Sequence, residues 1–203
     1  MLIDLAELDR REAYKLLTSI IVPRPIAWVG TRSGSGVDNL APFSFFNGVS
    51  TSPPIISVSV ARVGRSGLKD TAQNILETEA FSVNMVDVKR LEAMHQSSGS
   101  FRSDLSEFER VGLSAAACDR IDAPRVLESP ATLECTLHRA IDLGRTHLIL
   151  GDVVAIHVQE TLLDNGALDP MSMAPVARLG GAYATLGDLR VLPPPSLPEQ
   201  DRR

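Results

Sequence analysis

The sequence predicts a mainly β fold with peripheral helices, built around a closed or nearly closed antiparallel barrel. Six or more segments have strand-like patterning, and only a few have helical patterning. The strands do not alternate regularly with helices, as a doubly wound parallel sheet requires. With 203 residues, of which 44% are hydrophobic and 22% charged, the chain is long enough to bury one sizeable core.

The first elements are separated by prolines and glycines. Leucines recur near helical spacing among charged residues at 5–19, which predicts a short amphipathic helix. Pro23 and Pro25 exclude its continuation, because proline lacks the N–H and restricts the residue before it. A strand is predicted at 26–31. A glycine- and serine-rich turn at 32–38 then leads to a second extended segment at 39–47.

A third strand and a capped helix follow. Pro53 and Pro54 introduce a strand at 55–60, where proline is tolerated at the first position. A loop then leads to a helix at about 71–78, for which we expect Asp70 as N-cap and Gln73 as its capping-box partner.

The second half contributes longer strands. A strand is predicted at 81–86, followed by a polar, helical or irregular insertion outside the barrel at 87–111. In 132–138 the apolar residues Leu133, Cys135 and Leu137 are expected inside, and Thr132, Glu134, Thr136 and His138 outside. A long strand is expected at 147–158, bent at Gly151, with a short strand near 162–163.

Composition bounds the organisation and the environment of the chain. We expect one domain at 1–190 and a proline-rich, flexible tail at 191–203.

The net charge is -5 without a clustered basic run, which argues against a nucleic-acid partner. No apolar run approaches the ~20 residues of a membrane span. The N-terminal stretch lacks the features of a secretory signal, so we expect a cytoplasmic protein.

Familiar catalytic motifs are lacking in the sequence. Gly34 and Gly36 lead into a strand rather than a helix, so they do not form a dinucleotide fingerprint. The cysteines and histidines lack the spacing of a metal site, and no metal is predicted. The carboxylates are scattered, without the pairing of a glycoside hydrolase.

The segment 39–54 combines bulky aromatic residues with small hydroxyl and amide residues. Phe43, Phe45 or Phe46 could cover a flat ring, with Ser44 or Asn47 at its polar edge. The same phenylalanines could equally fill the core.

The segment 65–71 enters the predicted helix with Arg65, Ser66, Lys69 and Thr71. A helix N-terminus with such neighbours suits a phosphate monoester, although a solvated helix start has the same composition. The two segments together suggest an aromatic ring with a phosphate tail, such as FMN or pyridoxal phosphate. Pyridoxal phosphate usually requires a Schiff-base lysine, and no lysine lies in the aromatic segment.

Several runs, in order, resemble the flavin reductase-like family of FMN-binding split barrels. They are Pro23–Thr31, Asn39–Ser50 closed by Pro53-Pro54, Lys69–Ile75 with Phe81–Asn84, Gly151–His157 and Arg178–Tyr183. The resemblance covers roughly residues 8–190. It implies a split β-barrel of Greek-key topology, a homodimer and FMN near the subunit interface, with FAD as the alternative flavin.

The resemblance also implies a set of cofactor-binding residues. Residues on the first strand would approach the flavin, residues in 41–47 would run along its ring, and residues in 66–71 would surround the phosphate. The residues of the C-terminal motif would close the pocket. In full they are Trp28, Thr31, Ala41, Pro42, Phe43, Ser44, Phe45, Asn47, Ser66, Lys69, Asp70, Thr71, Arg178, Gly180, Gly181 and Tyr183.

The implied activity is an NAD(P)H-dependent flavin reductase that serves a monooxygenase or another electron-accepting protein. Reductases of the family often carry a histidine five residues before the strand glycine. Here Thr146 holds that place, and His147, one residue later, is the candidate near the nicotinamide site. The alternatives are a non-enzymatic FMN-binding electron carrier and, less well supported, a split barrel that binds a tetrapyrrole.

Overall fold

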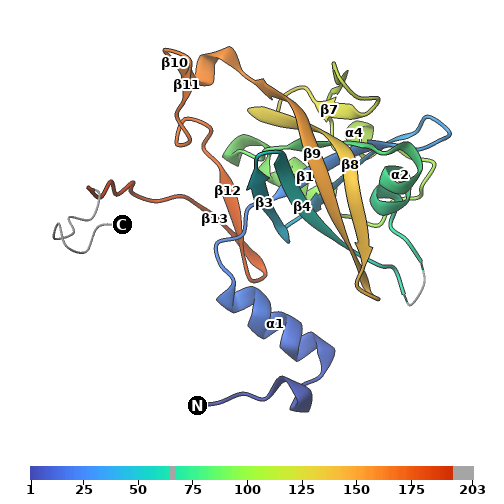
Figure 1. The fold of residues 1–203 in the computed structure, drawn as a ribbon, viewed down its shortest axis with the longest axis vertical. Helices are drawn as coiled ribbons and strands as arrows, with labels where there is room; N and C mark the ends of the chain where they lie inside the picture. Colours follow the sequence, from blue (N-terminus) through green and yellow to red (C-terminus); the bar gives the residue numbers. More distant parts are fainter. Residues whose placement is uncertain (65–66, 194–203) are drawn as a thin grey trace.

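A seven-stranded antiparallel sheet forms the centre of the computed structural model, which describes residues 1–64 and 67–193. The strand order is β2-β1-β5-β8-β9-β4-β3, and the sheet curls into a barrel (Figure 1). This confirms the predicted mainly β architecture. The strands are β1 (Ala27–Arg32), β2 (Asp38–Phe43), β3 (Phe46–Thr51), β4 (Pro54–Ala61), β5 (Ala80–Asn84), β8 (Ala131–Asp142) and β9 (Thr146–Val158).

Helices and small hairpins surround the barrel. The helices are η1 (Leu5–Glu7), α1 (Arg10–Ile20), α2 (Asp70–Thr78), η2 (Val88–Arg90), α3 (Leu91–Gln96), α4 (Glu107–Arg110) and η3 (Glu160–Leu162). The hairpins pair β6 (Ala115–Ala117) with β7 (Pro124–Val126), β10 (Leu163–Asp164) with β11 (Ala167–Leu168), and β12 (Val176–Leu179) with β13 (Ala182–Thr185). Among the described residues, no helix has the length and apolarity to cross a membrane.

Two buried apolar clusters lie on opposite faces of β1. Ala27 and Val29 point into the barrel, where they pack with Val83, Ile149 and the α2 residue Ile75. On the other face, a second cluster joins the outside of β1 and β2 to the segment at 87–127; its buried members are Ile26, Trp28, Leu40, Val86, Met94, Phe108, Val126 and Val176. The insertion predicted at 87–111 therefore lies outside the barrel but supplies Met94 and Phe108 to this core.

Gly151 allows β9 to pass close to the ring of Phe81. A Cβ atom at this position would overlap the Phe81 ring and would lie 3.3 Å from the Cβ of Cys135. The pairing of β8 with β9 shifts register on both sides of this point, between Glu134 and Cys135 and between Leu137 and Arg139. The bend predicted at Gly151 thus lies within an irregular stretch of the ladder.

The prediction that Glu134 faces outward is wrong. Glu134 is fully buried because the loop after β6 covers it. Thr132, also predicted outside, is buried as well, and its hydroxyl donates to the side-chain oxygen of Asn84, at 2.9 Å. The Glu134 carboxylate accepts hydrogen bonds from the backbone N–H groups of Asp119 and Arg120, at 2.8 and 2.7 Å. It also contacts Nε2 of His157 on β9.

The capping box predicted for α2 is also absent. Lys69 is the N-cap residue and makes no side-chain capping bond, whereas Asp70 is already the first helical residue. Gln73 donates to the side chain of Glu77, at 2.9 Å, rather than back to the cap. The start of α2 is held instead by burial of Thr71, Ala72, Asn74 and Ile75.

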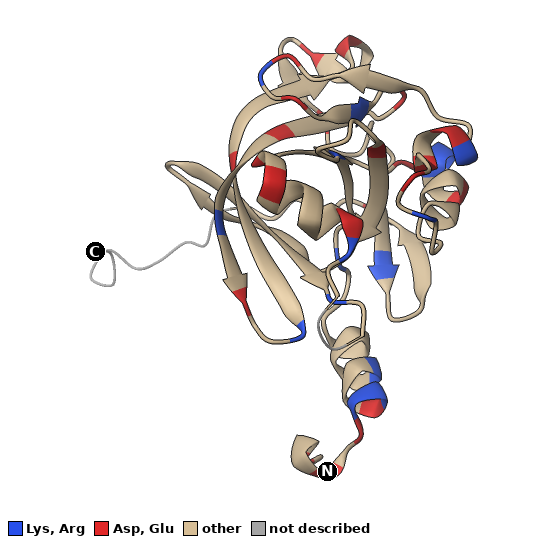
Figure 2. Ribbon diagram, turned by 90° about the vertical axis from the view of Figure 1, so that its right-hand side faces the viewer, with Lys and Arg blue, Asp and Glu red and all other residues tan. Residues whose placement is uncertain are grey.

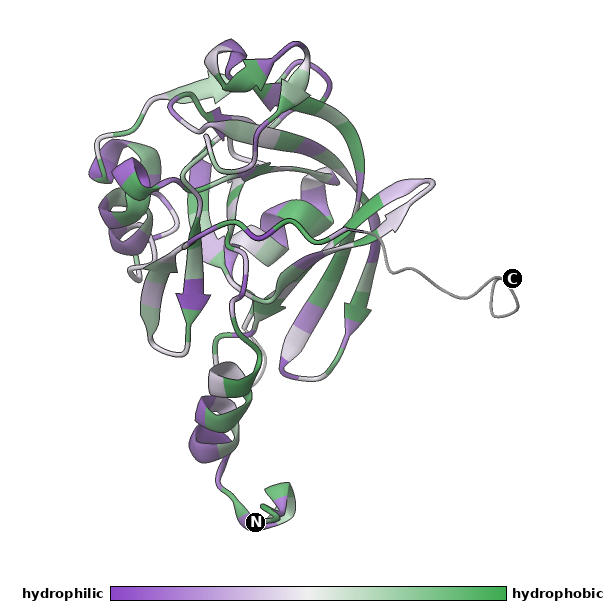
Figure 3. Cartoon of the chain, turned by 90° about the vertical axis from the view of Figure 1, so that its left-hand side faces the viewer, coloured by the Kyte–Doolittle hydropathy of each residue, from purple (hydrophilic) through white to green (hydrophobic). Residues whose placement is uncertain are grey.

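The helix predicted at 5–19 is divided in two. Asp9 caps a new helix, since its carboxylate accepts from the N–H groups of Arg11 and Glu12 while Glu12 bonds back to the Asp9 N–H. The resulting helix α1 extends away from the barrel (Figure 1). One side of it is hydrophilic and the other hydrophobic (Figure 3), and it contains Lys and Arg residues, coloured blue in Figure 2.

Candidate functional site

The strand predicted at 39–47 is interrupted at Ser44 and Phe45, which separate β2 from β3. This break forms part of the wall of a pocket of about 970 Å³, within the size range of small-molecule sites. Phe43 is buried, and Phe45 is 36% exposed. The pocket is lined by Arg10, Arg11, Tyr14, Pro42, Phe43, Ser44, Phe45, Ser59, Ala61, Arg62, Gly64, Lys69, Leu143, Arg145 and Thr146.

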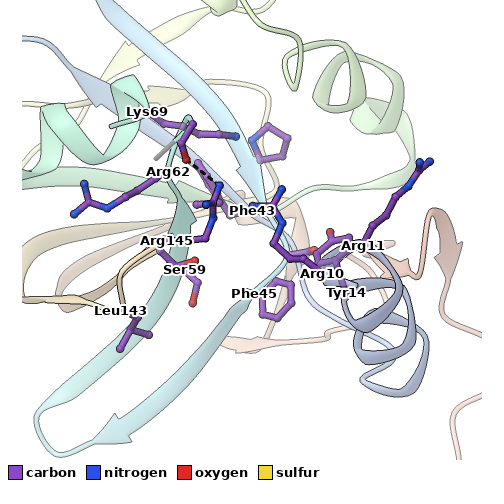
Figure 4. Close-up of a pocket in the computed structure, with 15 residues that line it drawn as sticks. Arg10, Arg11, Tyr14, Phe43, Phe45, Ser59, Arg62, Lys69, Leu143 and Arg145 are labelled. Carbon is purple, nitrogen blue, oxygen red and sulfur yellow. Dashed lines mark hydrogen bonds between the residues drawn. The ribbon is translucent and has the colours of Figure 1, made fainter. Parts of the chain in front are cut away.

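Cationic side chains meet at one end of this pocket (Figure 4). Lys69 places its Nζ atom 5.6 Å from the centre of the Phe43 ring. Arg145 donates a hydrogen bond to the carbonyl oxygen of Gly64, at 3.0 Å. Arg62 forms an ion pair with Asp142, at 2.8 Å. No aspartate or glutamate belongs to the described lining, so the pocket is a positively charged environment with an aromatic wall.

The register of two strands brings Arg62 and Arg145 together. β4 pairs with β9 so that Ala61 lies opposite Thr146, and the N–H of Arg62 donates to the carbonyl oxygen of Arg145, at 2.9 Å. The two arginines therefore flank the end of one strand pair, although 83 positions separate them in the numbering of the chain.

Helix α1 forms the opposite side of the pocket mouth through Arg10, Arg11 and Tyr14. Arg24, which is 4% exposed, holds the C-terminal end of this helix. Its Nη1 atom donates to the carbonyl oxygens of Thr18 and Ile21, at 2.6 and 2.8 Å.

Arg24 also connects the helix with the rest of the site. Its Nη2 atom donates to the carbonyl oxygen of Gly180, and its Nε atom to Oγ of Ser44, both at 3.3 Å. One guanidinium group thus joins α1, the β12–β13 hairpin and the aromatic segment.

A smaller pocket of about 180 Å³ adjoins the first, sharing Tyr14, Pro42, Phe43 and Ser44 with it. Its far wall contains Arg178, Tyr183 and His95. The guanidinium of Arg178 lies 4.4 Å from the centre of the Tyr183 ring. The Tyr183 hydroxyl is 3.0 Å from Nδ1 of His95.

The predicted site residues divide into those that the structure brings together and those that it does not. Pro42, Phe43, Ser44, Phe45 and Lys69 line the larger pocket. Arg178 and Tyr183 line the smaller one. Gly180, with a positive φ of 49°, turns the hairpin, beside the exposed Gly181. Ala41 packs against the barrel core.

Other predicted residues lie away from both pockets. Trp28 is fully buried and donates to Oγ of Ser97, at 2.9 Å. Thr31 is also fully buried, and its hydroxyl accepts from the side chain of Asn74, at 3.0 Å. Asn47 is exposed on β3.

The residues predicted around the phosphate are dispersed as well. The Thr71 hydroxyl is buried and accepts from the side-chain amide of Asn39, at 3.1 Å. Asp70 faces a separate pocket beside the β1–β2 turn. Ser66 lies outside the described residues.

His147 is 7% exposed on β9, behind the pocket wall. Its Nε2 atom lies 3.2 Å from a terminal nitrogen of Arg62. Its Nδ1 atom is buried and has no hydrogen-bond partner among the described residues. The neighbouring Thr146, rather than His147, is part of the lining.

Sequence reasoning did not identify the arginines of the pocket or His95. Arg24 could have been noticed, because an arginine between two prolines cannot lie in a regular helix or an interior strand. Arg10, Arg62, Arg145 and His95 carry no local signal, since only the folded chain brings the three arginines to the larger pocket and His95 to the smaller one.

One family model and several solved structures match most of this chain. The model of the flavin reductase like domain matches residues 19–185. Nitrilotriacetate monooxygenase component B from Bacillus cereus is 37% identical, with 95% of this chain and 98% of that chain covered and a TM-score of 0.91. The 2-nitrobenzoate 2-nitroreductase of Pseudomonas fluorescens is 34% identical, with 98% and 99% covered and a TM-score of 0.88.

A third solved structure, from Shewanella frigidimarina, is described as a candidate flavin reductase with a split barrel domain. It is 26% identical, with 95% of this chain and 98% of that chain covered and a TM-score of 0.82. The mainly β barrel of this chain therefore has the split-barrel fold of its structural neighbours. The match of the domain model over most of the chain establishes that this protein belongs to the flavin reductase-like domain family.

Proposed function

We propose that this chain is an FMN-binding oxidoreductase in which the larger pocket holds the flavin and NADH or NADPH supplies the electrons. The observation that carries the proposal is the combination of an aromatic wall and a cationic end in one pocket of about 970 Å³. Membership of the flavin reductase-like family makes a flavin the ligand to be expected there.

The residues of the pocket fit FMN. The rings of Phe43 and Phe45 provide apolar surface for the isoalloxazine, and Ser44 between them provides a hydroxyl for its polar edge. At the other end, Lys69 and Arg145 suit a phosphate, which carries about −1.5 to −2 charges at pH 7. The same features would accept the FMN half of FAD, which is the alternative flavin.

When bound, the flavin supplies hydride-transfer chemistry, and the protein supplies binding, orientation and electrostatics. Phe43, fixed by the barrel core, would orient the ring. The guanidinium of Arg24 would position Ser44 through their hydrogen bond. Lys69 and Arg145 would neutralise the phosphate. No side-chain acid or base is required for these roles.

A spectroscopic titration tests the proposal. Purified protein mixed with FMN should quench the flavin fluorescence and shift its visible spectrum at one equivalent per chain. NADH or NADPH should then be oxidised at a rate that depends on FMN and on an electron acceptor. If FMN does not bind, the proposal is wrong.

The alternative function is that of a non-enzymatic FMN-binding electron carrier. The displacement of the candidate histidine to position 147, behind the pocket wall, favours it. A flavin that binds and is reduced by dithionite, but is not reduced by either nucleotide, would select the carrier over the reductase.

The proposed assembly is a cytoplasmic homodimer that passes electrons to a monooxygenase. Apolar residues exposed on α1, namely Tyr14, Leu17 and Ile20, would favour burial against a second copy. The similarity to a monooxygenase component B supports a monooxygenase as the electron acceptor. Light scattering coupled to gel filtration measures the molar mass and so tests the dimer. Co-purification with a monooxygenase in the presence of FMN tests the partner.

A further inference from the structure

Arg10 occupies a distinctive place in the larger pocket. It is the first residue of α1, at the side of the pocket opposite Lys69 and Arg145, and its side chain extends from the helix into the space that Phe43 and Phe45 also line (Figure 4). Arg11 also belongs to the lining, but its side chain points away from the rings (Figure 4).

The positive charge of Arg10 is not compensated within the described chain. The described residues contain no ion pair or side-chain hydrogen bond of Arg10. By contrast, the pocket residue Arg62 has an ion pair with Asp142. An exposed arginine that lines an aromatic-walled pocket and has no carboxylate partner among the described residues is suited to an anionic ligand, because its planar fork matches phosphate oxygens.

One flavin phosphate does not account for all the cations. Lys69 and Arg145 together carry two charges, which match the about −1.5 to −2 charges of a phosphate monoester. Of the other lining cations, Arg62 is paired with Asp142 and Arg11 points away, so Arg10 remains as a further charge, on the α1 side of the pocket (Figure 4). A second phosphorylated ligand would complete the electrostatic balance of the pocket.

Arg24 fixes the helix that carries Arg10. It bonds to Thr18 and Ile21 at the C-terminal end of α1, and the N–H of Gly180 donates to the carbonyl oxygen of Thr18, at 3.2 Å. The capping box of Asp9 and Glu12 defines the other end of the helix. The position of Arg10 at the pocket mouth therefore follows from an anchored helix rather than from a free terminal segment.

We infer that Arg10 binds a phosphate group of a pyridine dinucleotide and determines the affinity of the pocket for that second substrate. The inference rests on the proposed function, since it assigns the electron donor to a defined end of the same pocket. Two phosphates of such a ligand share this chemistry, the 5′-pyrophosphate of NADH and NADPH and the 2′-phosphate of NADPH alone.

Calorimetry with two adenosine phosphates distinguishes the two sources. Adenosine 5′-diphosphate reports the pyrophosphate, and adenosine 2′,5′-bisphosphate reports the 2′-phosphate. Arg10→Ala in the full-length, FMN-saturated protein should weaken binding of one or both by about tenfold, as expected for a lost charged hydrogen bond. A loss confined to the bisphosphate would identify the 2′-phosphate as the group bound.

Lys15→Ala is the matched control, because Lys15 lies on the same helix and outside the pocket lining. It removes the same charge and should leave both affinities unchanged. A kinetic comparison adds a second readout: Arg10→Ala should raise KM for the dinucleotide but not for N-benzyl-dihydronicotinamide, a hydride donor without phosphates.

Three results would overturn the inference. They are an unchanged affinity in Arg10→Ala, an equal loss in Lys15→Ala, and an FMN affinity that falls in Arg10→Ala as much as that for the adenosine phosphates. The last result would assign Arg10 to the flavin instead. Failure of the wild-type protein to bind FMN contradicts the proposed function separately, and calorimetry on the flavin-free protein still tests Arg10.

Discussion

The buried guanidinium of Arg24 donates to the carbonyl oxygen of Thr18 at 2.6 Å. Three further hydrogen bonds of Arg24 reach Ile21, Ser44 and Gly180. These contacts hold the end of α1 and the β12–β13 hairpin against the pocket wall. The position of two pocket walls therefore depends on one side chain.

Replacement of Arg24 should destabilise the protein. Arg24→Ala removes hydrogen bonds from a buried charged donor and leaves carbonyl oxygens unsatisfied, so the free energy of unfolding should fall by about 2–3 kcal/mol. Urea denaturation measures this change. Arg11→Ala, which alters an exposed residue on α1, is the control and should change stability little. Equal stability of the Arg24 variant and the wild type would contradict the role assigned to Arg24.

Substitutions at Lys69 and Thr71 should have different effects: the first on the affinity for FMN, the second on the stability of the fold. Lys69→Ala removes an exposed ammonium group at the cationic end of the pocket, so FMN affinity should fall about tenfold while the melting temperature stays unchanged. Thr71→Val removes the buried acceptor of the Asn39 amide and should lower stability by about 1–3 kcal/mol. Fluorescence titration and thermal melts measure the two effects. The opposite pattern would show that the phosphate lies at Thr71.

The buried carboxylate of Glu134 should make the stability of the folded protein depend on pH in the acidic range. Burial raises the pKa of its carboxyl, but the hydrogen bonds from the Asp119 N–H, His157 and the Arg120 N–H outweigh burial and hold the pKa below its usual range. A carboxyl with a lowered pKa in the folded state contributes stability that is present above its unfolded pKa. That stability is lost as the pH falls through the folded pKa.

The melting temperature should therefore decline below about pH 4.5, the ordinary glutamate value. Glu134→Gln should lower the melting temperature at neutral pH and reduce the part of the acid-dependent decline that Glu134 contributes. Asp142→Asn is the comparison, because Asp142 also has a lowered pKa but is exposed and should have a smaller effect. Parallel curves for the wild type and the Glu134 variant would contradict this account.

Gly151 should not tolerate a side chain. The Cβ of Gly151→Ala would overlap the Phe81 ring, and overpacking of this kind costs about 1–3 kcal/mol. Gly48→Ala is the matched control, since a Cβ there meets no atom within 4 Å. Chemical denaturation compares the two variants. Phe81→Leu should partly rescue Gly151→Ala by removing the ring, and additive losses in the double variant would contradict the proposed overlap.

Local patterns in the sequence predicted most of the barrel. Alternating apolar residues located β5 and β8, because alternation directly reflects a strand with one buried face. Alternation gave the wrong face for Glu134. The loop that contains Asp119 and Arg120 buries a side of β8 whose polar residues suggest exposure to solvent. The capping-box pattern likewise gave the wrong start for α2, because tertiary burial of Thr71 and Ala72 decides the helix boundary.

By itself, the sequence determined a mainly β barrel, and the order of its motifs identified the family. The aromatic segment and Lys69 were also assigned from local composition, and they meet at one pocket. Only the tertiary structure decided that Trp28, Thr31 and Thr71 are internal and that Arg10 and Arg145 share a cavity with Lys69. The physical reason is that local composition records a preference for water or core, whereas strand register and helix anchoring determine which distant charges face one another.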